Sequence, residues 1–220
     1  MKGLWIKDLK LIGQQKTTMI VIILVGMFLT IQGATSSYAI GYISILSFTL
    51  TMGTISYDEF DHGMSFLLTL PVSRKLYVGE KYLLGLAGAV VALLAAVLMA
   101  FAAGTIKGTG ISIIETLGES YAMLCFTLIM MAVILPLKLK YGPEKERIIL
   151  LTMVATVFGV MYALSRIKTY FYPDLNIDEM LIGFLQVWGN AVLLLPFLLV
   201  LAFVGISYQI SLRIMERKEF

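Results

Sequence analysis

Long runs of residues without a single charged side chain constrain this chain more than any other feature. Five runs lack Asp, Glu, Lys and Arg altogether, at residues 17–57, 82–106, 120–137, 148–165 and 180–212. A charge-free apolar run of about 18 residues or more is typical of a helix that crosses the roughly 30 Å hydrocarbon core of a bilayer. The first run holds 41 residues, and as one helix it would be about 60 Å long, twice that thickness. We therefore divide it at the polar and small residues 32–37.

These runs predict an all-α membrane protein with six transmembrane helices, and residues 1–220 form one transmembrane domain. The expected spans cover approximately residues 17–32, 38–56, 82–106, 120–137, 148–165 and 187–209. The last run is longer than one span needs, so its outer part, with Gln186 and Trp188, is expected to be either an interfacial or a re-entrant helix.

The distribution of positive charge predicts the orientation. In this topology, 14 of the 17 Lys and Arg residues fall on one side, in the N-terminal segment, the connections after the second and fourth spans, and the tail. The connections on the other side hold only Lys107, Arg166 and Lys168. The positive-inside rule then places both termini in the cytoplasm.

Residues 1–16 are expected to form an amphipathic helix along the membrane surface. Its apolar residues recur at helical spacing: Leu4, Trp5, Leu9, Leu11 and Ile12. Lysines at positions 2, 7 and 10 can reach lipid headgroups. Two alternatives stay open. The lysines form the positive flank of a signal anchor, or the segment is a signal peptide cleaved near Ala34, although its amphipathic lead is long for that.

Small residues line one face of the third span at successive i+4 positions: Gly88, Ala92, Ala96, Ala100 and Gly104. Small side chains let helix backbones approach closely in lipid. The pattern predicts a helix-packing face, used within one subunit or between two subunits.

Residues for catalysis or metal binding are missing from the sequence. There is no GxxxxGK[ST] phosphate-binding loop, and His62 and Cys125 are each the only residue of their type, which excludes a conventional His/Cys metal cluster. No predicted span contains an ionisable Asp, Glu, Lys, Arg or His, which disfavours ion-coupled transport and an intramembrane hydrolase. We predict no enzymatic activity, no metal and no cofactor in this chain. Any ATP-driven module would be a separate polypeptide, because six spans fill most of the 220 residues.

Polar residues concentrate in the connection at residues 57–81. Its sequence passes from acids to an apolar patch, a proline and bases: Asp58, Glu59, Asp61; Met64, Phe66, Leu67, Leu68, Leu70; Pro71; Arg74, Lys75. Acids complement the positive end of a helix, and a proline ends it. We therefore expect a short amphipathic helix that begins at the acids. Such a helix suits a groove on a partner protein; the alternative is that it rests on lipid headgroups.

Two connections resemble the cytoplasmic loops of bacterial ABC-2-type permeases. In the first, the matching residues are Asp58-Glu59, Gly63, Leu70-Pro71-Val72-Ser73-Arg74, Val78 and Lys81. In the second, they are Leu135-Pro136-Leu137-Lys138, Lys140, Tyr141-Gly142, Glu144-Lys145 and Arg147. The hydropathy pattern is similar over the whole chain. It resembles the small six-span branch that includes the permease of the phenol-soluble modulin exporter.

The resemblance implies the membrane subunit of an ATP-driven exporter in the bacterial cytoplasmic membrane. Two permeases, identical or paired with a related chain, would assemble with two cytosolic ABC ATPase subunits that bind ATP and Mg. The loop helix would be the coupling helix that contacts the ATPase, through Asp58, Glu59, Gly63, Phe66, Leu70, Pro71 and Arg74. The residues implied in the second connection are Lys140, Gly142, Glu144 and Arg147.

The cargo expected from the resemblance and from the charge-free spans is an amphipathic peptide, antimicrobial or cytolytic. An ABC permease for lipids or drugs, or one for peptide-antibiotic immunity, fits the same motifs. The alternative from another class is a non-transporting membrane anchor or accessory subunit of a signalling or channel assembly. Co-purification of an ATPase separates these classes. We expect no nucleic-acid partner.

Overall fold

The computed structural model describes residues 2–31, 36–59, 63–69, 72–107, 113–142 and 191–218, with isolated positions between 145 and 170. The continuous segments are helical: α1 (Lys2–Gln14), α2 (Lys16–Ile31), α3 (Ser36–Glu59), α4 (Gly63–Thr69), α5 (Arg74–Lys107), α6 (Ile113–Tyr141) and α9 (Ala191–Arg217). The all-α prediction is therefore confirmed for the described residues.

Four of these helices contain stretches that are long and apolar enough to cross a membrane: Tyr38–Glu59, Arg74–Ala102, Thr116–Tyr141 and Leu194–Arg217. A fifth crossing is added if α1 and α2, which meet at a bend of 64°, count as one broken span. The predicted spans fall on α2, α3, α5, α6 and α9 except for one. The predicted span 148–165 lies outside the described residues apart from isolated positions.

Two helices extend well beyond the predicted spans into charged sequence. α5 begins at Arg74, eight residues before the predicted span, and α6 continues to Tyr141, four residues beyond the predicted span. Lys138, which follows the predicted fourth span, is therefore part of α6. Lys81 and Lys138 are buried inside the bundle. Both helices continue past the lipid-facing apolar run because other helices, rather than water, surround these charges.

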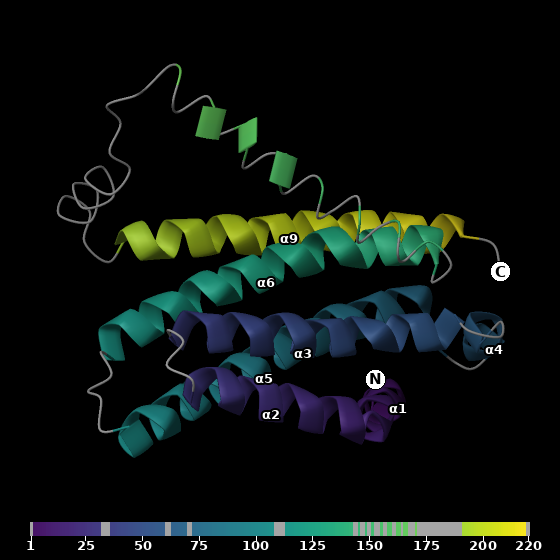
Figure 1. Ribbon diagram of the computed structural model, residues 1–220. Helices are drawn as coiled ribbons and strands as arrows, with labels where there is room; N and C mark the ends of the chain where they lie inside the picture. Colours follow the sequence, from purple (N-terminus) through teal and green to yellow (C-terminus); the bar gives the residue numbers. More distant parts are fainter. Residues whose placement is uncertain are drawn as a thin grey trace.

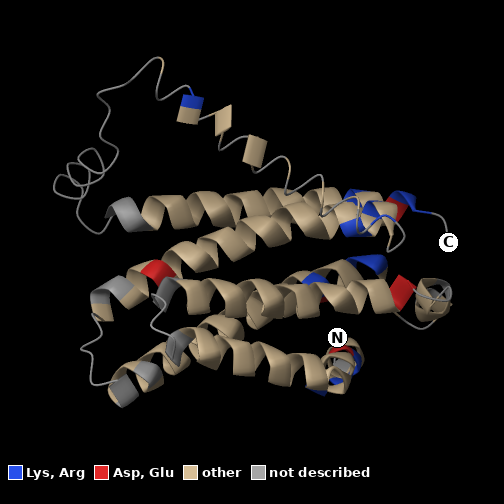
Figure 2. Ribbon diagram, in the orientation of Figure 1, with Lys and Arg blue, Asp and Glu red and all other residues tan. Residues whose placement is uncertain are grey.

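α3 lies between the other long helices of a bundle (Figure 1). It packs against α2, α5 and α6, while α9 packs against α6 and α5. Both termini lie toward one end of the bundle, where α3, α6 and α9 end and α5 begins (Figure 1). Charged residues gather at this end (Figure 2). We call it the charged end; it comprises α1, α4, the first turns of α5 and the last turns of α3, α6 and α9.

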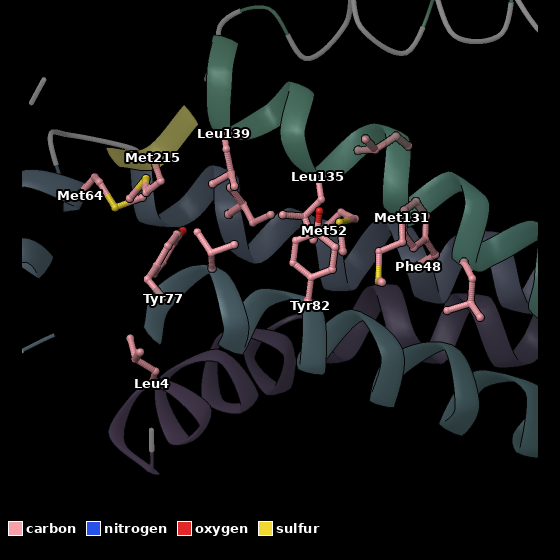
Figure 3. Packing of buried hydrophobic residues seen from close by; sticks show 14 of the residues in the cluster. Leu4, Phe48, Met52, Met64, Tyr77, Tyr82, Met131, Leu135, Leu139 and Met215 are labelled. Atoms are coloured by element: carbon pink, nitrogen blue, oxygen red, sulfur yellow. The ribbon is translucent and has the colours of Figure 1, made fainter. Parts of the chain in front are cut away.

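Two hydrophobic clusters hold the helices together. The larger cluster joins α1, α3, α4, α5, α6 and α9, and its buried members include Leu4, Met52, Met64, Tyr77, Leu135 and Met215 (Figure 3). The smaller cluster joins α2, α3 and α5 through Ile22, Ile40, Ile43, Leu93 and Ala96. The short helix α4 and the end of α9 therefore belong to the same core as the long helices.

The small-residue face of the third span is turned into the bundle. Ala92, Ala96 and Ala100 are 4%, 0% and 3% exposed, and Gly104 is also buried. A Cβ atom on Gly88 would lie 2.9 Å from the side chain of Thr51 in α3. This face of α5 therefore packs closely against α2 and α3 of the same chain.

α1 lies at the charged end and bends away from α2. Leu4 and Asp8, one turn apart, are buried, whereas Ile6 and Leu9 are 56% and 55% exposed. The helix has 13 residues and is about 20 Å long, which is too short to cross a bilayer alone. Its faces differ from the expected ones, because Asp8 is buried on the side of Leu4, while Leu9, expected on the same face as Leu4, is exposed.

Candidate functional site: the charged end of the bundle

Three helices that are distant in sequence bring five charged side chains together inside the charged end. Lys7 and Asp8 come from α1, Asp58 from the last turn of α3, and Glu80 and Lys81 from the second turn of α5. Asp8 and Glu80 are 0% exposed, Lys81 is 1% exposed and Asp58 is 6% exposed. We call these five residues the buried ionic cluster.

Lys81 lies at the centre of this cluster. Its ammonium contacts the carboxylate of Asp8 and lies 2.8 Å from Oδ2 of Asp58. It also donates a hydrogen bond to Oγ1 of Thr54 at 3.1 Å. Lys7 contacts the same Asp58 carboxylate and lies 3.1 Å from Asp8. The two lysines therefore connect α1, α3 and α5 through shared carboxylates.

The cluster holds more negative than positive charge. It contains three carboxylates and two ammonium groups, and its least compensated member is Glu80. No described residue donates a hydrogen bond to either carboxylate oxygen of Glu80, and the ammonium of Lys81 is 3.9 Å away. By contrast, Asp58 also accepts a hydrogen bond from the Tyr77 hydroxyl at 3.1 Å. A buried carboxylate without hydrogen bonds is costly, so Glu80 stabilises the cluster less than the other four residues do.

Lys7 lies at the outer edge of the cluster, with 31% of its side chain exposed. Burial lowers the pKa of Lys7, but the hydrogen bond to Asp58 and the charges of Asp58 and Asp8 outweigh this effect. The net result is a pKa above the ordinary lysine value. The ammonium of Lys7 therefore stays positive at neutral pH and offsets part of the negative charge.

A second group of contacts fastens the end of α9 to the loop helix region. The guanidinium of Arg74 donates hydrogen bonds to the carbonyl oxygens of Met215 at 3.0 Å and Glu216 at 2.8 Å. The last carbonyl groups of a helix have no partner within the helix, so Arg74 caps α9. The ammonium of Lys218, directly after α9, lies 2.7 Å from Oε1 of Glu59. We call Glu59, Arg74 and Lys218 the tail clamp.

α4 has an inner face and an outer face. Met64 and Leu67 are 2% and 7% exposed, and Met64 points toward Met215 of α9 (Figure 3). On the outer face, Phe66 is 70% exposed. The helix therefore presents one large aromatic side chain outward while its other face is part of the core.

Two motif glycines allow close approaches to the end of α3. A Cβ atom on Gly63 would lie 2.8 Å from the carbonyl oxygen of Asp58. Gly142 has φ of +72°, a conformation that favours glycine, and its N–H donates to the Lys138 carbonyl at 2.9 Å. This bond ends α6 in the manner of an αL cap. A Cβ atom on Gly142 would lie 2.8 Å from Oε2 of Glu59, so a larger residue would push against the tail clamp.

The structure differs from the sequence interpretation of the loop in two respects. Asp58 and Glu59 are the last residues of α3 rather than the first residues of the short helix, which starts at Gly63. Their carboxylates therefore do not cap α4, and both have partners within the chain. The apolar patch is also divided, because Met64 and Leu67 face the core and Phe66 faces outward.

The other predicted site residues are partly accounted for. Among the described residues, Asp58, Glu59, Gly63, Phe66, Arg74 and Gly142 lie together at the charged end. Lys140 is exposed near the end of α6. Leu70, Pro71, Glu144 and Arg147 lie outside the described residues.

Four residues of this region were not identified as site residues from the sequence: Lys7, Asp8, Glu80 and Lys218. Lys7 was expected to reach lipid headgroups, and the structure instead pairs it with Asp58. Asp8 is the only acid in the first 57 residues, and this isolation was the available signal. Glu80 stands beside Lys81 at the edge of an apolar run. Lys218 gave no signal, because its partner Glu59 is distant in sequence. Across the part of the chain that the structure describes, no group of three or more His, Cys, Asp and Glu side chains is arranged to hold a metal ion.

The comparisons with known proteins agree with the loop motifs. A protein-family model described as ABC-2 family transporter protein matches residues 3–216. The match covers all the described helices apart from their outermost residues at the two ends of the chain. No curated protein and no solved structure gave a match.

Proposed function

The chain belongs to the ABC-2 family of transporter proteins and is a permease component of such a transporter, and from this premise we propose that it serves export. In this proposal the charged end faces the cytoplasm, as the distribution of 14 against 3 Lys and Arg residues predicts. Two permeases, identical or paired with a related chain, assemble with two cytosolic ATPase subunits in the bacterial cytoplasmic membrane. The ATPase subunits bind ATP and Mg.

The proposed contact with the ATPase is α4, and the exposure of Phe66 is the observation that carries this proposal. A side chain of this size that is 70% exposed, on the outer face of a short helix at the charged end, offers an aromatic anchor for a groove on a partner. The inner face of the same helix supports the proposal, because Met64 and Leu67 belong to the core. A displacement of α4 would therefore shift side chains in the core that it shares with α3, α5 and α9.

The acids of the loop take a different role in this proposal from the one that the sequence first indicated. Asp58 joins α3 to α1 and α5, and Glu59 joins α3 to the tail after α9. These contacts make the charged end a connected unit. We assign Asp58 and Glu59 the transmission of motion from α4 to the spans, while Phe66 and its neighbours on α4 make the contact itself.

The proposed cargo is an amphipathic peptide. The charge-free middle of the spans supports this class, because a small hydrophilic ion would find no replacement there for its hydration shell. An amphipathic peptide can bury its apolar face against the spans and keep its polar face toward water or headgroups.

Purification of the tagged full-length chain from its host membranes tests the ATPase contact. We expect a P-loop polypeptide to co-purify, together with vanadate-sensitive hydrolysis of Mg-ATP. Phe66→Ala should weaken recovery of that polypeptide about tenfold or more, because loss of an aromatic anchor costs about 2 kcal/mol. The matched control is Leu117→Ala, which shortens a side chain that is 56% exposed at the opposite end of α6.

Two outcomes would contradict the proposal, at different levels. Equal ATPase recovery with Phe66→Ala and with the control would show that α4 is not the contact. If the unaltered chain retains no ATPase under conditions that keep it folded, the chain is not an ATP-driven permease, and the membrane-anchor alternative gains support.

A further inference from the structure

A basic hollow lies between the ends of α6 and α9. Its volume is about 540 Å³, and the residues that line it are Lys140, Ile210, Arg213, Ile214, Arg217 and Lys218. Four of these six side chains are cationic and two are aliphatic. Among the described residues, no acid lines the hollow.

The α9 residues of the hollow share one face of that helix. Positions 210, 213, 214 and 217 are separated by three or four residues, which places them one above another. The same face continues toward the middle of the helix with Leu199, Phe203 and Ile206, which are 63%, 42% and 57% exposed. An apolar strip that no described residue covers therefore leads directly into a pair of arginines.

The cations of the hollow differ in how far they are already neutralised. Lys218 is bound by the Glu59 carboxylate and donates to the Leu139 carbonyl. Lys140 lies 5.1 Å from the centre of the Tyr141 ring. Within the described part of the chain, no carboxylate forms an ion pair with Arg213 or Arg217. Two guanidinium groups are thus available to an anion that approaches from the membrane side.

From this arrangement we infer that the hollow binds the headgroup of an anionic phospholipid, with an acyl chain along the apolar strip of α9. Guanidinium groups form paired hydrogen bonds with phosphate oxygens, which suits Arg213 and Arg217 to a phosphodiester. Basic pockets between transmembrane helices on the cytoplasmic side have the properties that anionic headgroups require. The combination of a strip for the chain and cations for the head favours a lipid over a soluble anion. The inference rests on the placement of the charged end at a membrane surface, and it does not depend on the proposed cargo or ATPase.

The site adjoins the tail clamp. Lys218 lines the hollow and also holds Glu59, beside the start of α4. A bound phosphodiester therefore lies next to the contacts that fasten α9 to the loop helix region. We expect the lipid to stabilise the charged end as a whole.

Native mass spectrometry of the purified full-length chain tests this inference in the absence of any ATPase. The probe is phosphatidylglycerol, offered in competition with phosphatidylcholine of the same chain length. We expect one phosphatidylglycerol retained per chain and a higher unfolding temperature with phosphatidylglycerol than with phosphatidylcholine alone. The double variant Arg213→Gln/Arg217→Gln should lose at least tenfold in retention and should lose the temperature shift. The double variant Arg213→Lys/Arg217→Lys should keep part of both.

The matched control is Lys16→Gln/Lys75→Gln, which removes the same charge from exposed side chains of α2 and α5. Equal loss of retention in this control would overturn the inference and leave only general attraction between a positive flank and anionic lipid. Stabilisation by inorganic phosphate or glycerol 3-phosphate equal to that by phosphatidylglycerol would also overturn it, in favour of a soluble anion. A double arginine variant that binds lipid normally but loses a co-purifying ATPase would overturn it in favour of a protein contact.

Discussion

At the scale of single residues, the charged end depends on side chains whose partners come from other helices. Lys81 holds carboxylates from α1 and α3, and Arg74 caps a helix whose end is more than 140 residues away in sequence. Gly142 and Gly63 are equally specific, because each leaves room that a Cβ atom would fill. The effect of a substitution at these residues should therefore depend on the contacts of that position, and even conservative substitutions should change the stability of the protein by different amounts.

Gly142→Ala should destabilise the protein. The residue has φ of +72°, which costs an L-residue about 1–2 kcal/mol, and the added methyl group would meet the Glu59 carboxylate at 2.8 Å. The control is Gly118→Ala inside α6, where no atom lies within 4 Å of the added Cβ and where alanine favours the helix by up to about 1 kcal/mol. Thermal unfolding in detergent measures both. A loss of stability in the control equal to that in Gly142→Ala would contradict this account.

The buried ionic cluster predicts opposite results for two isosteric changes. Asp58→Asn leaves Lys7 and Lys81 with fewer counter-charges, and removal of one partner from a buried ion pair costs about 3–5 kcal/mol. Glu80→Gln replaces the carboxyl group that has the weakest contacts in the cluster, so it should leave stability unchanged or raise it. The same unfolding measurement, at neutral pH and constant salt, compares the two. Similar large losses for both variants would show that Glu80 is a required member of the cluster.

At the scale of secondary-structure elements, contacts from α3, α4 and α5 hold the end of α9 in place. α4 contributes Met64 to the core, α5 contributes Arg74 to the cap of α9, and the residue after α9 pairs with α3. The end of α9 is thus held by contacts that do not depend on lipid. The local stability of the last turn of α9 should therefore fall when one of these contacts is removed.

Arg74→Ala should loosen the last turn of α9. The variant leaves the carbonyl groups of Met215 and Glu216 without their cationic donor, and hydrogen exchange of amides near residues 212–218 should speed up about tenfold. Lys75→Ala is the neighbouring control, because Lys75 is 72% exposed and pairs with Glu216 only at 3.7 Å, a contact worth little. Hydrogen exchange followed by mass spectrometry measures both variants. Unchanged exchange in Arg74→Ala would mean that the core contacts of Met215 suffice to hold the turn.

The sequence predicts where the long helices lie and much less about how they end. Hydropathy located α2, α3, α5, α6 and α9, because a bilayer selects charge-free runs. It left the first eight residues of α5 and the last four residues of α6 outside the spans, because a single-chain pattern treats Lys81 and Lys138 as exposed when other helices bury them. The acids at the end of α3 were assigned to α4 for the same reason. Their partners Lys7 and Lys218 are 51 and 159 residues away, and no local rule connects such positions.

At the scale of the whole molecule, the described helices form an apolar body with a charged end. The orientation of the charged end is a prediction that labelling can check. In a Cys125→Ala background, single cysteines at Thr109 and Asn176 should react with an impermeant maleimide in intact cells. A cysteine at Thr69, on α4, should react only after permeabilisation. Reaction at Thr69 in intact cells would reverse the topology and remove the basis for an ATPase contact at α4.

The cargo prediction concerns the body of the permease rather than its charged end. If the spans accept amphipathic helical peptides, the purified permease and ATPase, reconstituted together in lipid, should hydrolyse ATP several-fold faster in the presence of such peptides. The reason is that a path without ionisable groups interacts through apolar contact, so stimulation should follow the amphipathicity of a peptide rather than its exact sequence. The measurement compares ATP turnover across peptides of equal composition whose apolar residues either follow one helical face or are scrambled. The same measurement on the Phe66→Ala complex, corrected for the amount of bound ATPase, shows whether stimulation of ATP turnover depends on α4. Equal turnover with ordered and scrambled peptides, or stimulation by a lipid or small drug alone, would exclude peptide export. Neither result would bear on the ATPase contact, which the co-purification experiment tests separately.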